Sequence, residues 1–166
     1  MTVKISASAM AAALLRRLKG EEVTRKFSAL LQYDCRLPLD VQQQEASEVF
    51  PQIVELSNLV LFAPENVCVH SSRIVIGVAT YSIYDMSLLD RIDVCADTCF
   101  SGVSVEVFDI VDTYDKFGGF DHIFPGIEGV YQTPVVGVWN DGVLIERASG
   151  ENARDLISKV LGISAL

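Results

Sequence analysis

The stretch QTPVVGVWNDGVLIERASG, Gln132 to Gly150, decides the fold of this chain. Two strand-like runs within it, Pro134 to Trp139 and Val143 to Arg147, flank the residues Asn140-Asp141-Gly142. An Asp-Gly step supplies the positive φ angles that tight hairpin turns need. The stretch therefore predicts two antiparallel strands joined by a short turn.

A helix is expected directly after the hairpin, between Glu151 and Leu161. An acidic residue in its first turn and Gly162 after its last turn favour these two ends. Its apolar side chains share one helix face and are Ala153, Leu156, Ile157 and Val160. The chain is thus expected to close on an amphipathic helix.

Upstream of the hairpin, the sequence predicts a strand, a helix and a second strand. Arg73 to Thr80, RIVIGVAT, is rich in β-branched residues and lacks the alternation typical of a strand with one solvent-exposed face. Val103 to Val111 has a similar composition. A helical face between these runs is formed by Met86, Leu88, Leu89 and Ile92. We expect a βαβ unit with a right-handed crossover, whose strands are covered on both faces.

The N-terminal part reads as all-helical. Helices are predicted over Ser6 to Leu18 and from about Glu21 to Tyr33. A third is predicted beyond Asp40, a good N-cap, and ends before Asn58, with Pro51 able to divide it. The predicted organisation is a helical segment over residues 1–65 and an α/β domain over residues 66–166.

This order of elements resembles the thioredoxin superfamily, from about Val67 to the C-terminus. The most specific part is Gln132 to Gly150, with a Thr-Pro pair, a strand, a Gly-containing turn, a second strand and a final Gly. The resemblance implies a thioredoxin-like mixed sheet flanked by helices. It also implies a cis bond between Thr133 and Pro134, beside which the backbone binds an extended peptide or glutathione.

The redox motif of that family is absent. A Cys-x-x-Cys pair would stand where the first strand passes into the first helix, because the helix N-terminus promotes thiolate formation. Thr80 to Met86 reads TYSIYDM, and no cysteine occurs between Val69 and Val94. The standard dithiol mechanism is therefore excluded. Binding residues predicted around this place are Ser82, Tyr84, Asp85, Tyr131, Thr133 and Pro134, with Ser82 or Asp85 also expected to cap the helix.

The cysteines leave one redox alternative open. Cys95 and Cys99 have i, i+4 spacing, so a helix would place them on one face. We expect them after the predicted helix, away from its N-terminus, where packing as small apolar residues is the favoured role. His70 near Cys68 and the isolated His122 lack a complete ligand set, so neither a metal nor another cofactor is predicted.

Charge and hydropathy narrow the classes of partner. The 166 residues carry a net charge of −9, which repels polyanions and makes nucleic acid a poor partner. The apolar stretch Ile5 to Leu15 is shorter than the roughly 20 residues that a transmembrane helix needs. Few cysteines and no zinc-type spacing favour the cytoplasm.

Two functions are consistent with these features. The favoured hypothesis is a non-redox module, an adaptor, chaperone-like or regulatory protein, that binds an unidentified protein beside the proline at 134. The alternative is a divergent thiol- or glutathione-dependent oxidoreductase or redox sensor that uses Cys95 and Cys99. The second hypothesis, which makes the protein an enzyme or a sensor, is the less favoured one. A homodimer through the N-terminal helices is also expected, because they carry the apolar residues Met10, Leu14, Leu18, Phe27, Leu30 and Leu31.

Overall fold

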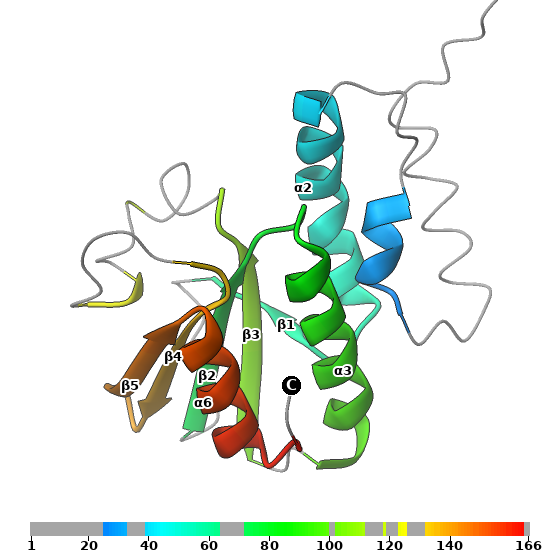
Figure 1. The fold of residues 1–166 in the computed structure, drawn as a ribbon. Helices are drawn as coiled ribbons and strands as arrows, with labels where there is room; N and C mark the ends of the chain where they lie inside the picture. Colours follow the sequence, from blue (N-terminus) through cyan, green and yellow to red (C-terminus); the bar gives the residue numbers. More distant parts are fainter. Residues whose placement is uncertain are drawn as a thin grey trace, which may run out of the picture.

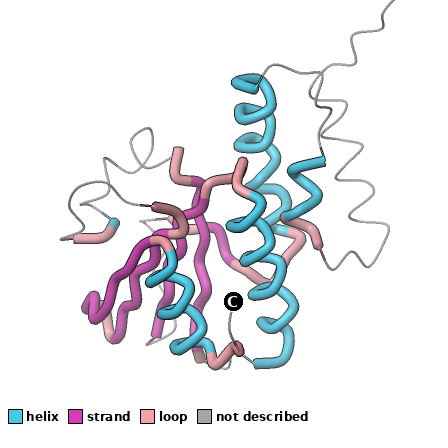
Figure 2. Tube along the Cα trace, viewed as in Figure 1, coloured by secondary structure: helices cyan, strands magenta, loops and turns pink. Residues whose placement is uncertain are grey.

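The computed structural model describes residues 25–32, 39–63, 72–99, 102–111, 118, 123–125 and 132–164. Figures 1 and 2 show how these parts are arranged. The elements are η1 (Ser28–Gln32), α2 (Leu39–Glu55), β1 (Val60–Leu61), β2 (Ser72–Val78), α3 (Ile83–Cys99), β3 (Val103–Asp109), β4 (Val135–Asn140), β5 (Val143–Ser149) and α6 (Glu151–Leu161).

The strands form one mixed sheet in the order β1-β3-β2-β4-β5. The first three are parallel to one another, whereas β4 runs antiparallel to β2 and β5 runs antiparallel to β4. The α/β class with helices flanking a mixed sheet is therefore confirmed. The turn of the β4–β5 hairpin has positive φ angles at Asp141 and Gly142, as an Asp-Gly turn requires.

One face of the sheet carries the helices. Ile74 of β2 lies opposite Val105 of β3 and Val138 of β4, and all three side chains are buried in one apolar cluster with residues of α2, α3 and α6. In Figure 1, α3 and α6 lie in front of the sheet. The absence of polar alternation in β2 has its cause here, because both faces of the strand are covered.

The opposite face is packed with aromatic rings. Phe108 lies between Phe62 and Phe124, with ring centroids 5.6 and 5.9 Å away, and Phe124 continues to Trp139 at 5.9 Å. Arg73 lies over the rings of Phe62 and Trp139 and forms a salt bridge with the buried Glu106.

Residues before β2 belong to the same core as those after it. Phe27 and Leu30, beside and within η1, are buried in the helix-side cluster, as is Phe50 of α2. The predicted boundary between residues 65 and 66 lies after β1. Strand β1 nevertheless pairs with β3 and so belongs to the same sheet as the later strands. Met10, Leu14, Leu18 and the side chain of Leu31 lie outside the described residues, so the homodimer stays a prediction.

Several local predictions for this part were wrong. Asp40 lies inside α2 rather than at its N-cap, and the helix passes through Pro51 without dividing. An internal proline costs about 3 kcal/mol, and the burial of Phe50, Ile53 and Val54 on both sides of it offsets that cost. Within the stretch from Glu21 to Tyr33, the described part is a turn followed by a short 3-10 helix.

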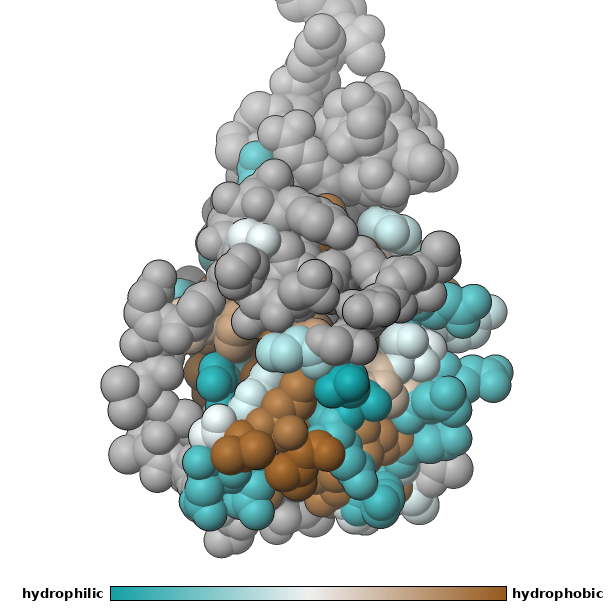
Figure 3. All heavy atoms as spheres, turned by 90° about the vertical axis from the view of Figure 1, so that its left-hand side faces the viewer, coloured by the Kyte–Doolittle hydropathy of each residue, from teal (hydrophilic) through white to brown (hydrophobic). Residues whose placement is uncertain are grey.

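The outer strand β5 is the exposed edge of the sheet. Val143 and Ile145 are 63% and 56% exposed. Figure 3, which turns the left-hand side of Figure 1 to the viewer, shows apolar atoms gathered between hydrophilic ones. The exposed charges of Glu146 and Arg147 on the same strand oppose uncontrolled pairing of this edge with other chains. Among the described residues, no helix is long and apolar enough to span a bilayer.

Candidate functional site

Ser82 caps the N-terminus of α3. Its Oγ accepts a hydrogen bond from the backbone N–H of Asp85 at 3.3 Å, and its carbonyl accepts one from Met86 at 3.0 Å. A serine that bonds to the third N–H of a helix satisfies one of the donors left open there. The capping role predicted for Ser82 is confirmed.

Asp85 has a different role from capping. Its side chain is buried, and Oδ2 accepts a hydrogen bond of 2.9 Å from the N–H of Ala79, which lies just after β2. The side chain of Thr133 also hydrogen-bonds to this carboxyl group. On the other side, Nη2 of Arg154 in α6 lies 3.9 Å from Oδ1. One carboxyl group thus joins the end of β2, the loop before β4 and the last helix.

The environment of Asp85 favours its protonated form. Burial raises the pKa of this carboxyl group above its usual range. The Ala79 N–H, the Thr133 side chain and the Arg154 guanidinium each lower the pKa, but they offset the effect of burial only in part. Asp85 therefore takes up a proton at a higher pH in the folded protein than in the unfolded chain.

The loop before β4 is held against the start of α6. The N–H of Gly150 donates to the carbonyl oxygens of Gln132 and Pro134, at 3.0 and 2.9 Å. Gly150 has a φ of 63°, and a Cβ there would lie 3.1 Å from Oε1 of Gln132, so glycine suits both the backbone and the space. The Thr133–Pro134 peptide bond is cis, which is the isomer that the sequence predicts.

The end of β2 and the start of β4 lie side by side, because Gly77 is the register partner of Val135. Every element of the expected series is then in place: the parallel pair β2 and β3 joined by α3, Thr-Pro before β4, the hairpin, and α6. The fold is thioredoxin-like.

Comparisons with known proteins add little to this assignment. No protein-family model matches the chain, and no curated protein matches it. Solved structures do match, among them a mutant thioredoxin from Halobacterium salinarum NRC-1, with 14% sequence identity over 72% of this chain and 85% of that chain and a TM-score of 0.38. The thioredoxin-like assignment rests on the order and direction of the elements.

Exposed apolar side chains precede Asp85, the hydrogen-bond partner of Thr133, in this thioredoxin-like fold. Tyr81, just before α3, and Ile83 and Tyr84, in its first turn, are 51%, 59% and 74% exposed. The segment that carries them meets the loop before β4 at Asp85, which hydrogen-bonds to the Thr133 side chain. We call Tyr81, Ile83, Tyr84 and Thr133 together the Thr133 edge. Among the described residues, none forms a hydrogen bond with the backbone N–H or C=O of Thr133.

The possible redox residues lie elsewhere. Cys95 and Cys99 fall within α3, not after it as the sequence suggested. Cys95 is partly buried, and a helix rises about 1.5 Å per residue, so about 18 Å of helix separates it from Ile83. The side chain of Cys99 and the whole of Tyr131 lie outside the described residues. The thiol of Cys95 and the Thr133 edge therefore cannot act on one small group together.

A second buried carboxylate lies at the same end of the sheet. Asp109, at the end of β3, accepts hydrogen bonds from Ser47 Oγ at 2.7 Å, Thr80 Oγ1 at 3.3 Å and the N–H of Val111 at 3.2 Å. These bonds tie α2 to the ends of β2 and β3, a structural role. Within the described residues, no group of three or more His, Cys, Asp or Glu side chains could hold a metal ion.

Sequence reasoning missed part of this site. Tyr81 and Ile83 flank the predicted Ser82, and their apolar character in a strand-to-helix connection was the available signal. Arg154 stands far from Asp85 in sequence, and nothing local marks it as a partner. Asp85 was predicted as a possible helix cap, but its side chain links three elements. Helix-capping rules consider only local sequence, so they do not predict such tertiary contacts.

Proposed function

We propose that this chain is a non-redox protein-binding module that holds an extended segment of a partner protein at the Thr133 edge. The observation that carries the proposal is the combination of a fixed backbone and exposed apolar side chains. Asp85 and Gly150 hold the loop around Thr133 from two sides. Tyr81, Ile83 and Tyr84, in the segment that leads to Asp85, supply exposed contact area.

This combination suits recognition of an extended peptide. The peptide backbone would pair with the N–H and C=O of Thr133, as strands added to a sheet edge do. Aromatic side chains add large contact area at a low cost in conformational entropy and are common among the residues that dominate binding energy. A loop that is ordered before binding also loses less entropy when the partner arrives.

The chemistry of the same place argues against disulfide exchange. Ser82 and Asp85 stand three residues apart at the start of α3, and neither can form a disulfide. Both have structural partners, Ser82 in the helix cap and Asp85 in the network with Ala79, Thr133 and Arg154. The adaptor, chaperone-like or regulatory role of such a module depends on the partner.

The first test is a peptide selection. Peptides selected from a random display library on the full chain should lose affinity by about tenfold or more for Tyr84→Ala, since a central aromatic contact contributes about 2 kcal/mol. Val143→Ala is the matched control, because Val143 is also well exposed but lies on β5. Equal affinities for wild type and Tyr84→Ala, measured by calorimetry, would reject the Thr133 edge as the binding site.

The second test addresses the redox alternative. The reduced protein should show no catalysis of insulin disulfide reduction, because the start of α3 carries no thiol. The rate should equal that of dithiothreitol alone and should not change in the Cys95→Ser variant. Turnover that disappears in Cys95→Ser would contradict the proposal and favour the thiol-dependent alternative.

A further inference from the structure

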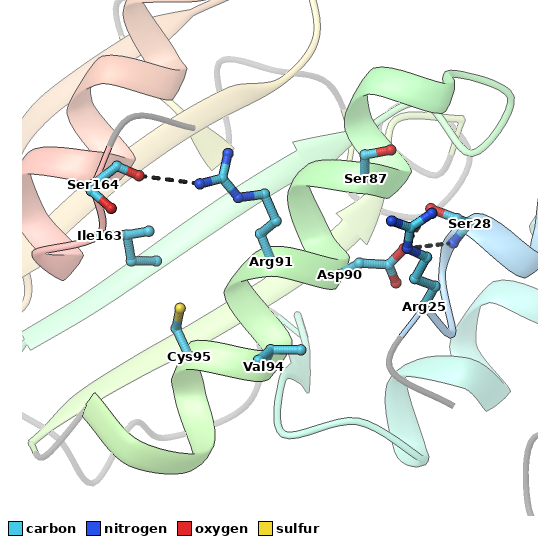
Figure 4. A pocket seen from close by; sticks show the side chains of 9 residues that line it. All are labelled: Arg25, Ser28, Ser87, Asp90, Arg91, Val94, Cys95, Ile163 and Ser164. Atoms are coloured by element: carbon cyan, nitrogen blue, oxygen red, sulfur yellow. Dashed lines mark hydrogen bonds between the residues drawn. The ribbon is translucent and has the colours of Figure 1, made fainter. Parts of the chain in front are cut away.

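A pocket of about 480 Å³ lies across the outer side of α3, away from the Thr133 edge. Figure 4 shows how three parts of the chain form it. The floor is a row of α3 side chains that includes Ser87, Arg91 and Val94, one helical turn apart. Arg25 and Ser28 form one wall, and the residues after α6 form the other. Volumes of about 300 to 1,000 Å³ are typical of sites for small organic ligands.

The accessible charge in this pocket is positive. Arg25 and Arg91 both line it, and both residues are exposed. Arg91 uses Nη2 to donate to the carbonyl oxygen of Ser164 at 3.2 Å. A guanidinium group has five N–H donors, so this bond leaves several for a ligand. Two exposed guanidinium groups in one pocket are notable in a chain whose net charge is −9.

The acidic residue of the pocket is engaged by protein groups. Asp90 is buried, and its carboxyl oxygens accept hydrogen bonds from the N–H of Phe27 at 2.8 Å and the N–H of Ser28 at 3.1 Å. The hydroxyl of Ser28 donates to the same group. Burial raises the pKa of Asp90 above the usual range of a carboxyl group, and the hydrogen bonds from Ser28 and Phe27 lower it in part. Asp90 thus fixes the Arg25–Ser28 wall, and three protein donors share its carboxyl oxygens.

Apolar groups complete the lining. Val94 on α3 is 52% exposed. Ile163 lies on the side of the pocket opposite Arg25, close to Arg91 and Cys95 in Figure 4. Ser87 adds a hydroxyl group to the lining, whereas the hydroxyl of Ser28 donates to Asp90. A ligand that fills the pocket therefore meets Arg91 and the hydrocarbon of Ile163 on one side and the second cation, Arg25, on the other.

We propose that this pocket binds a small organic anion, with a carboxylate or phosphate group held by Arg91 and a hydrocarbon part against Val94 and Ile163, while Arg25 adds positive charge at the opposite wall. Guanidinium groups pair with both kinds of anion through charge-assisted hydrogen bonds. The site is independent of the proposed peptide binding, because its residues on α3 begin at Ser87 and contain none of the Thr133 edge.

The test is a titration of the full, isotope-labelled protein followed by NMR. The probes are hexanoate, hexyl phosphate, hexanol and inorganic phosphate. One or both hexyl anions should produce saturable shifts in the amides of Arg91, Val94 and Ile163, and the tighter of the two identifies the anionic group. Hexanol and inorganic phosphate should each bind at least about tenfold more weakly, because each lacks one half of the contacts.

Variants separate this site from general charge attraction. Arg91→Gln should weaken binding of the tighter hexyl anion by about tenfold or more. Arg147→Gln removes the same charge from the exposed strand β5 and should leave the affinity unchanged. The bound anion should also slow alkylation of Cys95, which lines the pocket.

Three results would overturn the proposal. The first is the absence of saturable shifts with both hexyl anions. The second is binding of hexanol or inorganic phosphate as tight as that of the hexyl anions, which would mean a purely apolar or purely ionic contact. The third is an equal loss of affinity in Arg91→Gln and Arg147→Gln, which would mean that only net charge matters.

Discussion

Replacing Phe108 with alanine should lower the free energy of unfolding by about 3 to 5 kcal/mol, the usual range for truncating a buried phenylalanine. Phe108 is 1% exposed and lies at the centre of the aromatic face of the sheet. Its removal would leave a cavity between Phe62 and Phe124, which both pack on its ring. Because Trp139 ends the same row of rings and is the only tryptophan, its fluorescence reports the unfolding of this face.

Gly77 provides a check on the same packing. A Cβ at Gly77 would lie 2.6 Å from Cζ of Phe108, its register partner in β3. Gly77→Ala should therefore destabilise wild type by about 1 to 3 kcal/mol and cost less when combined with Phe108→Leu. Val111→Ala, at an exposed site, should change stability by less than about 0.5 kcal/mol. A neutral Gly77→Ala in wild type would contradict the packing described.

The C-terminal half of the fold could be predicted because its signals are local. The turn at Asp141-Gly142 requires positive φ angles, and the structure has them there. Helix α6 has the predicted bounds, Glu151–Leu161. The spacing of its apolar residues indicated the buried face, and Gly162 indicated the C-terminal end. The buried strand β2 was predicted from its β-branched composition. Its observed ends differ from the predicted ends by one or two residues.

The N-terminal half was predicted less well because its structure depends on distant contacts. Strand β1 has only two residues, Val60 and Leu61, and it forms only by pairing with Glu106 and Val107 of β3. No sequence pattern of that length separates a strand from a loop. The continuation of α2 through Pro51 likewise reflects burial against the core, which outweighs a local preference.

For the candidate site, it was easier to predict which residues take part than which residues they contact. Ser82 was expected to cap α3 and does so, and Thr133 and Tyr84 were singled out from their place in the sequence. The position of Cys95 within α3 was missed, because the helix extends further than its apolar face suggested. The salt bridge from Asp85 to Arg154 joins two elements that no local pattern connects.

Replacing Asp85 with alanine should lower the free energy of unfolding by about 2 to 3 kcal/mol, since a buried donor loses its acceptor. The N–H of Ala79 would lose its 2.9 Å partner, and Thr133 and Arg154 would lose theirs. The Thr133 edge should loosen, so peptides selected on wild type should bind more weakly. Asp155→Ala on the exposed side of α6 is the control and should affect neither property.

Asp85→Asn separates the hydrogen bonds of this side chain from its charge. The folded-state pKa of Asp85 is raised above the value of 3.8 expected for an unperturbed carboxyl, because burial disfavours the charged form. The stabilisation from holding this proton is fully present below the unfolded pKa and is lost as the pH rises through the folded pKa. Asparagine keeps an acceptor for Ala79 and carries no charge, so Asp85→Asn should gain stability relative to wild type as the pH rises through that window.

Urea unfolding of wild type and Asp85→Asn across the acid and neutral range measures this difference in stability. Asp90 is present in both proteins, so its similar contribution cancels. A wild type that gains stability relative to Asp85→Asn as the pH rises would show that Arg154 and Thr133 hold the charged carboxylate more strongly than burial opposes it.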